Sequence, residues 1–448
     1  MNHDQDNHAA DRSRTALEPI YRRNFLFFLL DNICFNLTTN ILGPTTVIPD
    51  FLRRLTQSEV LIGLSSNLFD VGSTLPQLFI ARYIIRFRRM KWWFVLPNIP
   101  GRLAIIGIAV LIFLIGKDNP QGILVAFFVC YITAAVGNGI TNVPIWVMFG
   151  SSLDNRWRSR VLGFTSAIVG VLMLGISPLV GLVLSDSALT FPNNYGVIFG
   201  AAGILFALAI LPVIFVHELP SNQAVDKIPS FAEFLPKLGS ILRTDLPFRA
   251  MIIIRVLTSL FAMASPFYIG FATIRLGLSS TVAVPTLLAT QTLGGVCGAL
   301  LFAWLAARST VLYMRLAQAM ALIVPISALL AGRVGPLPLY IGFLVLGLTL
   351  GNLFASYHNW VISYAMPQQR AIYAGLFNTI GGVFGLVIPL IGGTIAQHLG
   401  YELLFVVALL TASGALYVTL RYIPSRIVEP PSTIDADKVA STDHSMVE

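Results

Sequence analysis

The sequence predicts an all-α polytopic membrane protein, in which twelve transmembrane helices form two pseudo-symmetric halves of six helices each. Three observations predict this fold: the composition, a series of twelve apolar stretches, and a motif that occurs once in each half. Of the 448 residues, 56% are hydrophobic and only 11% are charged. Soluble globular proteins carry about 25% charged residues, so this chain has too little polar surface to coat a soluble globule.

The twelve apolar stretches divide the chain into five segments. Each stretch is close to the roughly 20 residues that a helix needs to cross the hydrocarbon of a bilayer. The predicted spans are residues 24–48, 58–81, 93–115, 122–149, 160–185, 195–216, 250–273, 281–306, 312–331, 337–363, 371–397 and 401–421. They give an N-terminal half at 24–216 and a C-terminal half at 250–421, flanked by a tail at 1–23, a linker at 217–249 and a tail at 422–448.

The positions of the basic residues predict the orientation. A net charge of +8 is compatible with nucleic acid binding, but most of the 29 Lys and Arg residues fall in the tails and on one set of alternate loops. By the positive-inside rule these segments lie in the cytoplasm. We therefore expect an integral protein of the cytoplasmic (plasma) membrane, with both termini cytoplasmic, contacts to membrane lipids and no nucleic acid partner.

The first three spans carry charged residues at similar depth. Asp31 lies in span one, Asp70 in span two and Arg102 in span three. At 1.5 Å per residue, each lies about 10–16 Å from the predicted cytoplasmic end of its span. A lone charge at the centre of a span costs about 2.5–3.5 kcal/mol on insertion scales, and a partner reduces that cost. We therefore expect Arg102 to pair with one of the two aspartates.

Span one also carries an amide stripe. Its members, spaced by four residues, share one face of a helix: Asn32, Asn36 and Asn40. Amides that face lipid are costly, so this face is expected to look into protein or into a water-filled cavity.

Spans four and ten carry the repeated motif. The first copy contains Gly137, Asn138, Trp146 and Arg156, and the second, a little over two hundred residues later, contains Gly351, Asn352, Trp360 and Arg370. Each copy is followed by a Gly/Pro pattern, which is Gly170, Pro178 and Gly181 in the first and Gly381, Pro389 and Gly392 in the second. A long-period repeat in an apolar chain is typical of carriers built from two related halves.

The two longest polar segments outside the spans differ in character. In the linker at 217–249, apolar residues from Phe231 to Leu242 recur at helical spacing, which predicts an amphipathic helix on the cytoplasmic membrane surface. The C-terminal tail at 422–448 is rich in Pro, Ser, Thr and acidic residues and is predicted to be disordered.

Twelve spans, a repeat of six spans and a basic loop between spans two and three resemble the major facilitator superfamily over about residues 24–421. The basic loop contains Arg82, Arg86, Arg88, Arg89 and Lys91. Its signature departs from that of the family, because Gln77 replaces a glycine and Ala81 replaces an acid associated with gating. Span five, with its Gly/Pro pattern, partly resembles the motif of the antiporters in this family, which favours export.

This resemblance implies that spans one, four, seven and ten line a central path, with the substrate bound near the midplane. The candidate residues of this path are Asn36, Asn138, Asn142, Arg255, Asn352 and Ser356. Asn138 and Asn352 are expected to face each other across it. Alternatively, these amides hold neighbouring helices together, and Trp146 and Trp360 are expected to be anchors at the membrane interface.

Asp31, Asp70 and Arg102 are the candidates for proton coupling. Asp31 leads, because alternating access can move a carboxylate between a desolvated environment and one next to a mobile cation such as Arg255 or Arg102. A permanent structural ion pair is the alternative for Asp31, and helix packing is the alternative for Asp70. Arg255 either binds an anionic group of the substrate or extends towards the headgroups.

The sequence thus predicts a secondary active transporter that moves a small molecule by alternating access, coupled to protons, with export as the favoured direction. The alternatives are a uniporter or importer of a polar metabolite, and a transporter-like sensor or scaffold. An enzyme is disfavoured: His217-Glu218 lacks the second histidine of a metalloprotease motif, because Ser221 occupies that position. We expect no metal, no cofactor and a monomer.

Overall fold

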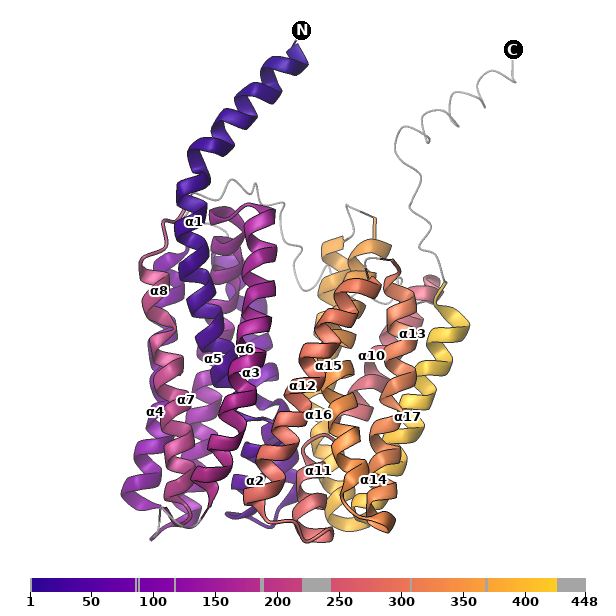
Figure 1. Cartoon of the computed structure of the whole chain (residues 1–448). Coiled ribbons are helices and arrows are strands. Elements are labelled where there is room, and N and C mark those ends of the chain that lie inside the picture. The colour runs from indigo at the N-terminus through magenta and orange to yellow at the C-terminus, as the bar shows by residue number, and fades with distance from the viewer. Residues whose placement is uncertain are drawn as a thin grey trace, which may run out of the picture.

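The computed structural model describes residues 2–84, 87, 89–116, 118–185, 189–219, 243–306, 308–366 and 370–424. Within these ranges the chain forms helices and no strands. They make two bundles that lie side by side, one from the indigo-to-magenta part of the chain and one from the orange-to-yellow part (Figure 1). The beginning of the first helix and the end of the last lie at the same end of the molecule, which we call the terminus end; the opposite end is the far end.

The N-terminal half contains eight helical segments. They are α1 (Asn2–Leu42), α2 (Val47–Arg53), α3 (Glu59–Ile84), α4 (Lys91–Ile115), α5 (Pro120–Ser152), α6 (Asn155–Leu184), α7 (Asn193–Leu208) and α8 (Ile210–Ile214). Segments α7 and α8 follow each other within one membrane crossing. The short α2 does not cross, so this half contributes six crossings.

The C-terminal half repeats this plan. It contains α10 (Leu246–Ala262), α11 (Phe267–Gly270), the π-helix η1 (Phe271–Arg275), α12 (Ser280–Ala306), α13 (Thr310–Ala321), α14 (Ile323–Val334), α15 (Leu337–Tyr364), α16 (Arg370–Leu399) and α17 (Tyr401–Tyr422). Segments α10 to η1 form one crossing, and α13 with α14 forms another.

By length and hydropathy, eleven helices of the described ranges qualify as membrane spans. The twelfth crossing is α3, whose 26 residues reach about 39 Å at 1.5 Å per residue. Its hydropathy is low because it carries several polar side chains, among them Asn67 and Asp70. The predicted all-α fold of two six-helix halves is confirmed.

Four sequence-based predictions about segments differ from the structure or fall outside it. Residues 2–23 of the predicted tail form the first part of α1, which is helical from Asn2. Span one was predicted to run to residue 48, but α1 ends at Leu42, where Gly43 adopts a φ of +49° and Pro44 follows. The predicted amphipathic helix at 231–242 and nearly all of the C-terminal tail lie outside the described residues.

Polar side chains fasten the terminus end of the N-terminal half. The buried Asn24 donates to the carbonyl oxygens of Ser152 (3.1 Å) and His217 (2.9 Å) and accepts from the amide of His217 (2.8 Å). Glu218 accepts hydrogen bonds from the first amides of α4, including that of Lys91 (3.1 Å). The His217-Glu218 pair, which superficially resembles part of a metalloprotease motif, therefore closes a helix bundle and caps a helix N-terminus.

In each half, a basic side chain donates to a carbonyl oxygen at the end of the sixth crossing. Lys91, at the start of the third crossing, donates to the carbonyl oxygen of Ile214 (3.0 Å). Arg315, near the start of the ninth crossing, donates to the carbonyl oxygen of Ile423 (3.0 Å). A cation near the C-terminal carbonyls of a helix is favourable, and its recurrence reflects the repeat.

Glycines bring neighbouring helices into close contact, as is common between membrane helices. On α12, a methyl group at Gly294 or Gly298 would overlap a backbone carbonyl oxygen of α15. On α5, a methyl group at Gly139 would overlap the backbone of Ser73 on α3. These contacts fix the core of each half without large side chains.

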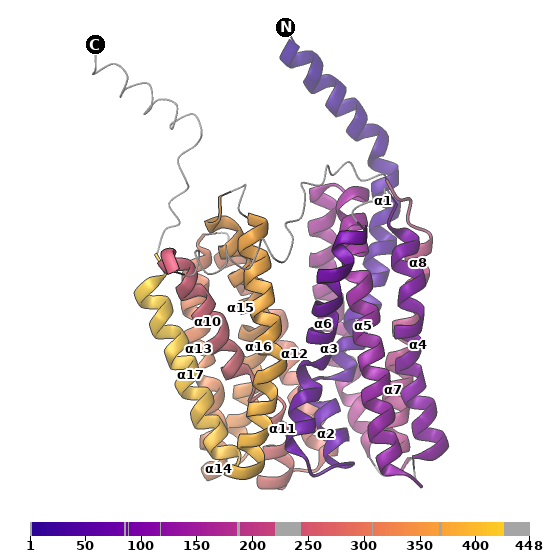
Figure 2. The same ribbon diagram turned by 180° about the vertical axis from the view of Figure 1, so that it is seen from behind.

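The halves meet through two helix pairs: α16 packs on α3, and α12 packs on α6. Figure 1 shows the pair of α6 and α12, and Figure 2 shows α3 and α16 from behind. A methyl group at Gly63 would lie 2.6 Å from the carbonyl oxygen of Pro389, and one at Gly181 would lie 2.8 Å from the Pro285 ring. Gly181 and Pro389 of the repeated Gly/Pro pattern therefore lie at the contact between the halves, whereas Gly381 and Gly392 pack on Arg255 and Met263 of their own half. The contacts between the halves lie at the far end, and the ribbons separate towards the terminus end.

The close contact between α12 and α15 predicts opposite effects for two adjacent glycines. Gly294→Ala should lower the free energy of unfolding by about 1–3 kcal/mol, because the new methyl group collides with the Leu344 carbonyl oxygen. Gly295→Ala meets its nearest atom at 3.9 Å and should gain up to about 1 kcal/mol from helix propensity. Unfolding of the purified variants in detergent measures both. Equal stability of the two variants would refute the packing.

Candidate functional site

A cavity of about 150 Å³ lies inside the N-terminal half, between α1, α4 and α5. Its wall combines aromatic rings with charged and amide groups: Asp31, Asn32, Phe35, Phe94, Arg102, Asn138, Thr141, Asn142, Ile145, Trp146 and Phe149. Four of the predicted site residues, Asp31, Arg102, Asn138 and Asn142, therefore border one space.

Asp31 and Arg102 form a buried and loose ion pair. Arg102 Nη2 lies 3.6 Å from Asp31 Oδ1, with both side chains almost fully buried. Arg102 Nη1 donates to the carbonyl oxygen of Phe206 (2.9 Å), and its guanidinium lies 4.8 Å from the centre of the Phe206 ring. Asp31 Oδ1 and Arg102 Nε have no hydrogen-bond partner among the described residues. Arg102 is thus held by backbone and aromatic contacts, whereas Asp31 depends on electrostatic attraction.

The amide stripe of span one satisfies its donors within its own helix. Asn32 donates to the carbonyl oxygen of Phe28 (2.9 Å), and Asn36 donates to that of Asn32 (2.8 Å). Asn40 continues the series by donating to the carbonyl oxygen of Asn36 (2.8 Å). These bonds reduce the cost of a polar stripe at membrane depth, and Asn32 reaches the cavity wall.

Asn138 bonds to a neighbouring helix and borders the cavity. Its amide donates to Ser73 Oγ (3.1 Å), and Ser73 Oγ donates to the carbonyl oxygen of Ala135 (3.2 Å). It therefore ties α5 to α3 while also bordering the cavity. Asn352, its counterpart on α15, is half-buried.

In the C-terminal half, Arg255 stacks on aromatic rings. Its guanidinium lies 4.2 Å from the centre of the Phe354 ring and 5.5 Å from that of Phe377. Ser356, predicted to line the path, is fully buried and donates to the carbonyl oxygen of Leu353 (2.6 Å). The expectation that Ser356 faces an open path does not hold in this conformation, because its hydroxyl bonds within α15.

Asp70 is separated from Arg102 and interacts with the other half. Its side chain is exposed and borders a second cavity of about 70 Å³ together with Tyr131. It attracts Arg255 electrostatically across the boundary between the halves. The structure thus brings Arg102 to Asp31 and Arg255 towards Asp70, rather than Arg255 towards Asp31.

The repeated motif has different surroundings in its two copies. A methyl group at Gly137 would lie 3.1 Å from the Gly101 backbone, whereas Gly351 has no neighbour within 4 Å of such a group. Trp146 is 55% exposed. Trp360 is fully buried and stacks on Tyr364 at 4.5 Å, so the prediction of an interface anchor is wrong for it. Arg156 is exposed, and the side chain of Arg370 lies outside the described residues.

A model of the Major Facilitator Superfamily matches residues 28–385 of this sequence. The chain belongs to this superfamily. No curated protein matched it by sequence. It is a member of a transporter family rather than an enzyme, as the sequence predicts.

Solved structures of facilitators share this fold at low sequence identity. A nucleoside transporter, NupG, is 12% identical with a TM-score of 0.69, covering 90% of this chain and 100% of its own. A D-xylose-proton symporter is 13% identical with a TM-score of 0.66, covering 90% and 98%. A bacterial homologue of the human lysosomal transporter Spinster, in an inward-facing and unoccupied conformation, is 12% identical with a TM-score of 0.62, covering 93% and 99%.

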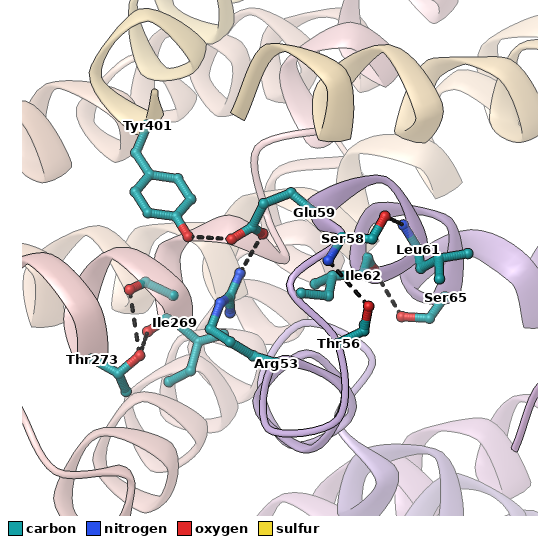
Figure 3. A network of polar contacts seen from close by, with 11 residues as sticks. Arg53, Thr56, Ser58, Glu59, Leu61, Ile62, Ser65, Ile269, Thr273 and Tyr401 are labelled. Atoms are coloured by element: carbon teal, nitrogen blue, oxygen red, sulfur yellow. Dashed lines mark hydrogen bonds and ion pairs between the residues drawn. The ribbon is translucent and has the colours of Figure 1, made fainter. Parts of the chain in front are cut away.

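The sequence reasoning missed a polar contact that joins the two facilitator halves at the far end. Glu59, at the start of α3, accepts from Arg53 of α2 (2.6 Å) and from the Tyr401 hydroxyl of α17 (2.5 Å), as Figure 3 shows. We call these three residues the far-end latch. The Arg53 guanidinium lies directly against Gly270 of the C-terminal half, where a methyl group would overlap it.

A second group of bonds crosses the same boundary. Asp50 accepts from the Tyr195 hydroxyl of its own half and from Ser280 Oγ of the other (3.0 Å). Thr45 donates to Gln291 Oε1 (3.1 Å). Thr45, Asp50 and the latch residues Arg53 and Glu59 lie between the predicted first and second spans or at their edges.

The buried ion pair predicts a non-additive effect on stability. Arg102→Gln should lower the free energy of unfolding by about 3 kcal/mol, because it leaves the Asp31 carboxylate buried without a counter-charge. Asp31→Asn with Arg102→Gln should recover part of that loss, because no charge then remains. A double-mutant cycle on the purified protein in detergent measures the coupling. Additive losses would show that the two side chains do not interact.

The far-end latch predicts a change in conformational populations. Tyr401→Phe removes a hydrogen bond to a charged group, worth about 1.5 kcal/mol, and should open the far end roughly tenfold more often. Spin labels on cysteines placed at Asp118 and Val334 in a background without native cysteines report the distance between the halves at this end.

The matched control for the latch is Glu402→Gln, which alters an exposed ion pair between Glu402 and Arg275 within one half. It should leave the distance distribution unchanged. If Tyr401→Phe behaves like this control, the latch does not hold the halves together.

Proposed function

We propose that this facilitator is a secondary active transporter that moves a small molecule by alternating access and couples that movement to protons. The observation that carries the proposal is the loose Asp31–Arg102 ion pair at the wall of a cavity within the membrane-spanning region. A buried carboxylate whose Oδ1 atom has no hydrogen-bond partner among the described residues can take up a proton there without breaking a hydrogen bond, which suits it to binding and releasing a proton.

Alternating access is supported by where the halves touch. Direct contacts join α3 to α16 and α6 to α12, together with the far-end latch. Rocking about these helix pairs would open the far end and close the terminus end. With both termini in the cytoplasm, as the distribution of basic residues predicts, the present conformation faces inward.

Asp31 is the proposed proton carrier for two reasons. It is buried next to a cation that is already fixed by the Phe206 carbonyl oxygen, so protonation of Asp31 leaves Arg102 with a partner. Asp31 also borders the same cavity as Asn138 and Asn142, whose amides suit a polar ligand. The nucleoside transporter and the D-xylose-proton symporter with this fold support a polar solute and a proton as partners.

Uniport or import of a polar metabolite is the second candidate, and the fixed position of Arg102 favours it. If the ion pair is permanent, Asp31 stabilises the half without carrying protons. The Gly/Pro pattern that favours export packs at the contact between the halves, a role that serves either direction. We propose a monomer in the plasma membrane, in contact with lipids.

Asp31→Asn should abolish proton movement that depends on substrate. The measurement uses purified protein in liposomes with an internal pH-sensitive dye, to which sugars, organic anions, peptides and hydrophobic cations are added in turn. The expected result is a substrate-triggered proton flux in the wild type and a reduction of at least tenfold in Asp31→Asn, because an amide cannot accept the proton.

Asp118→Asn is the matched control, because Asp118 is an exposed carboxylate in a loop at the far end. It should retain the wild-type flux. Substrate uptake without proton movement, equal in the wild type and Asp31→Asn, would favour uniport and assign Asp31 a structural role.

A further inference from the structure

We propose that the transported molecule carries an acidic group, a carboxylate or a phosphate, which binds the guanidinium of Arg255. This inference rests on the proposed transport function and adds the substrate class. It comes from the contacts that Arg255 makes and from those that it lacks.

Arg255 has donors without acceptors. Its Nε and Nη1 atoms are buried and have no hydrogen-bond partner among the described residues. Within the same ranges it forms no ion pair at 4.0 Å or less. A guanidinium carries five N–H donors and no acceptor, and the oxygens of a carboxylate or phosphate can accept from them.

Two aromatic rings and a glycine surround the Arg255 guanidinium. Three helices contribute, because Arg255 comes from α10, the Phe354 ring at 4.2 Å from α15 and the Phe377 ring at 5.5 Å from α16. On α16, a methyl group at Gly381 would lie 2.8 Å from Arg255 Nε. The rings stabilise the cation, and the glycine leaves room for it, so the guanidinium is held in place before any ligand arrives.

Arg102, another arginine within the spans, has oxygen partners for part of its guanidinium, although its own buried Nε has no hydrogen-bond partner among the described residues. Arg102 has the Asp31 carboxylate at 3.6 Å and the Phe206 carbonyl oxygen at 2.9 Å. Arg255 has aromatic contacts but neither of these oxygen partners. An anionic ligand would supply the missing oxygens.

Asp70 links the Arg255 site electrostatically to the N-terminal half. It attracts Arg255 electrostatically from α3, in the N-terminal half, without forming an ion pair. An acidic ligand on Arg255 therefore feels repulsion from Asp70, and its binding changes the attraction between the halves. A ligand that changes a contact between two domains shifts their conformational equilibrium.

The experiment compares matched acids and neutral analogues on the purified full-length protein. The probes are benzoate with benzamide, N-acetylglycine with N-acetylglycinamide, and glucose 6-phosphate with glucose, so the carboxylate and phosphate arms are separate. Ligand-induced shifts in melting temperature give Kd values, and uptake into liposomes gives transport.

Acids should bind and be transported, and their neutral analogues should not. Arg255→Gln should raise the Kd of the acid at least tenfold. Arg255→Lys should give an intermediate value, because it keeps the charge and loses the fork. Asp70→Asn should lower the Kd, because it removes the repulsion. Arg275→Gln, which affects an exposed ion pair with Glu402 in the same half, is the control and should match the wild type.

Two results would overturn the inference. If the wild type transports only the neutral members or cations, or if folded Arg255→Gln transports the acid as the wild type does, Arg255 is not the anion site although transport stands. If the wild type transports nothing from either this set or the earlier panel, the proposed function fails and the inference fails with it. Melting of the ligand-free variants establishes whether each is folded. If Arg255→Gln does not fold, Arg255→Lys provides the test in its place.

Discussion

The structure depends on one constraint, which is that a polar group at membrane depth must find its partner inside the protein. The amides of Asn36 and Asn40 meet it by donating to carbonyl oxygens one turn earlier on α1. Arg102 meets it with a carbonyl oxygen, a carboxylate and an aromatic ring. Arg255 meets it less completely, because its buried Nε and Nη1 atoms have no hydrogen-bond partner among the described residues.

The same constraint shapes the boundary between the halves. Glycines such as Gly63 and Gly181 let backbone and proline rings approach closely where α3 meets α16 and α6 meets α12. The additional attachment is polar, because the far-end latch bonds Glu59 to Arg53 and Tyr401. This contact consists of close packing at glycines and a few hydrogen bonds. Such a contact can break and re-form. A boundary of this kind is compatible with two stable arrangements of rigid halves.

The fold followed from the sequence because hydropathy and length report directly on the solvent that surrounds a helix. The site followed only in part. Depth along the spans was enough to predict that Arg102 would have an aspartate as partner, but the choice of Asp31 depends on how α1 and α4 rotate about their axes. The repeat predicted equal roles for Trp146 and Trp360, yet one is exposed and the other buried, because the repeat preserves the backbone and not the neighbours. The latch was missed because Tyr401 is 342 residues away from Glu59 in the sequence, and because each of the three residues alone resembles a loop charge or an interfacial tyrosine.

The two pairs of acid and arginine differ in what rocking of the halves does to them. Asp31 and Arg102 lie on α1 and α4 of the same half, so a rigid-body movement leaves their distance unchanged. Asp70 and Arg255 lie on α3 and α10 of different halves, so the same movement must alter theirs. If Asp31 carries the proton, its coupling therefore operates through access to its cavity and not through an exchange of cationic partners. The attraction that changes with conformation is the one at Arg255, which makes that residue the point where binding of an acidic ligand and movement of the halves affect each other.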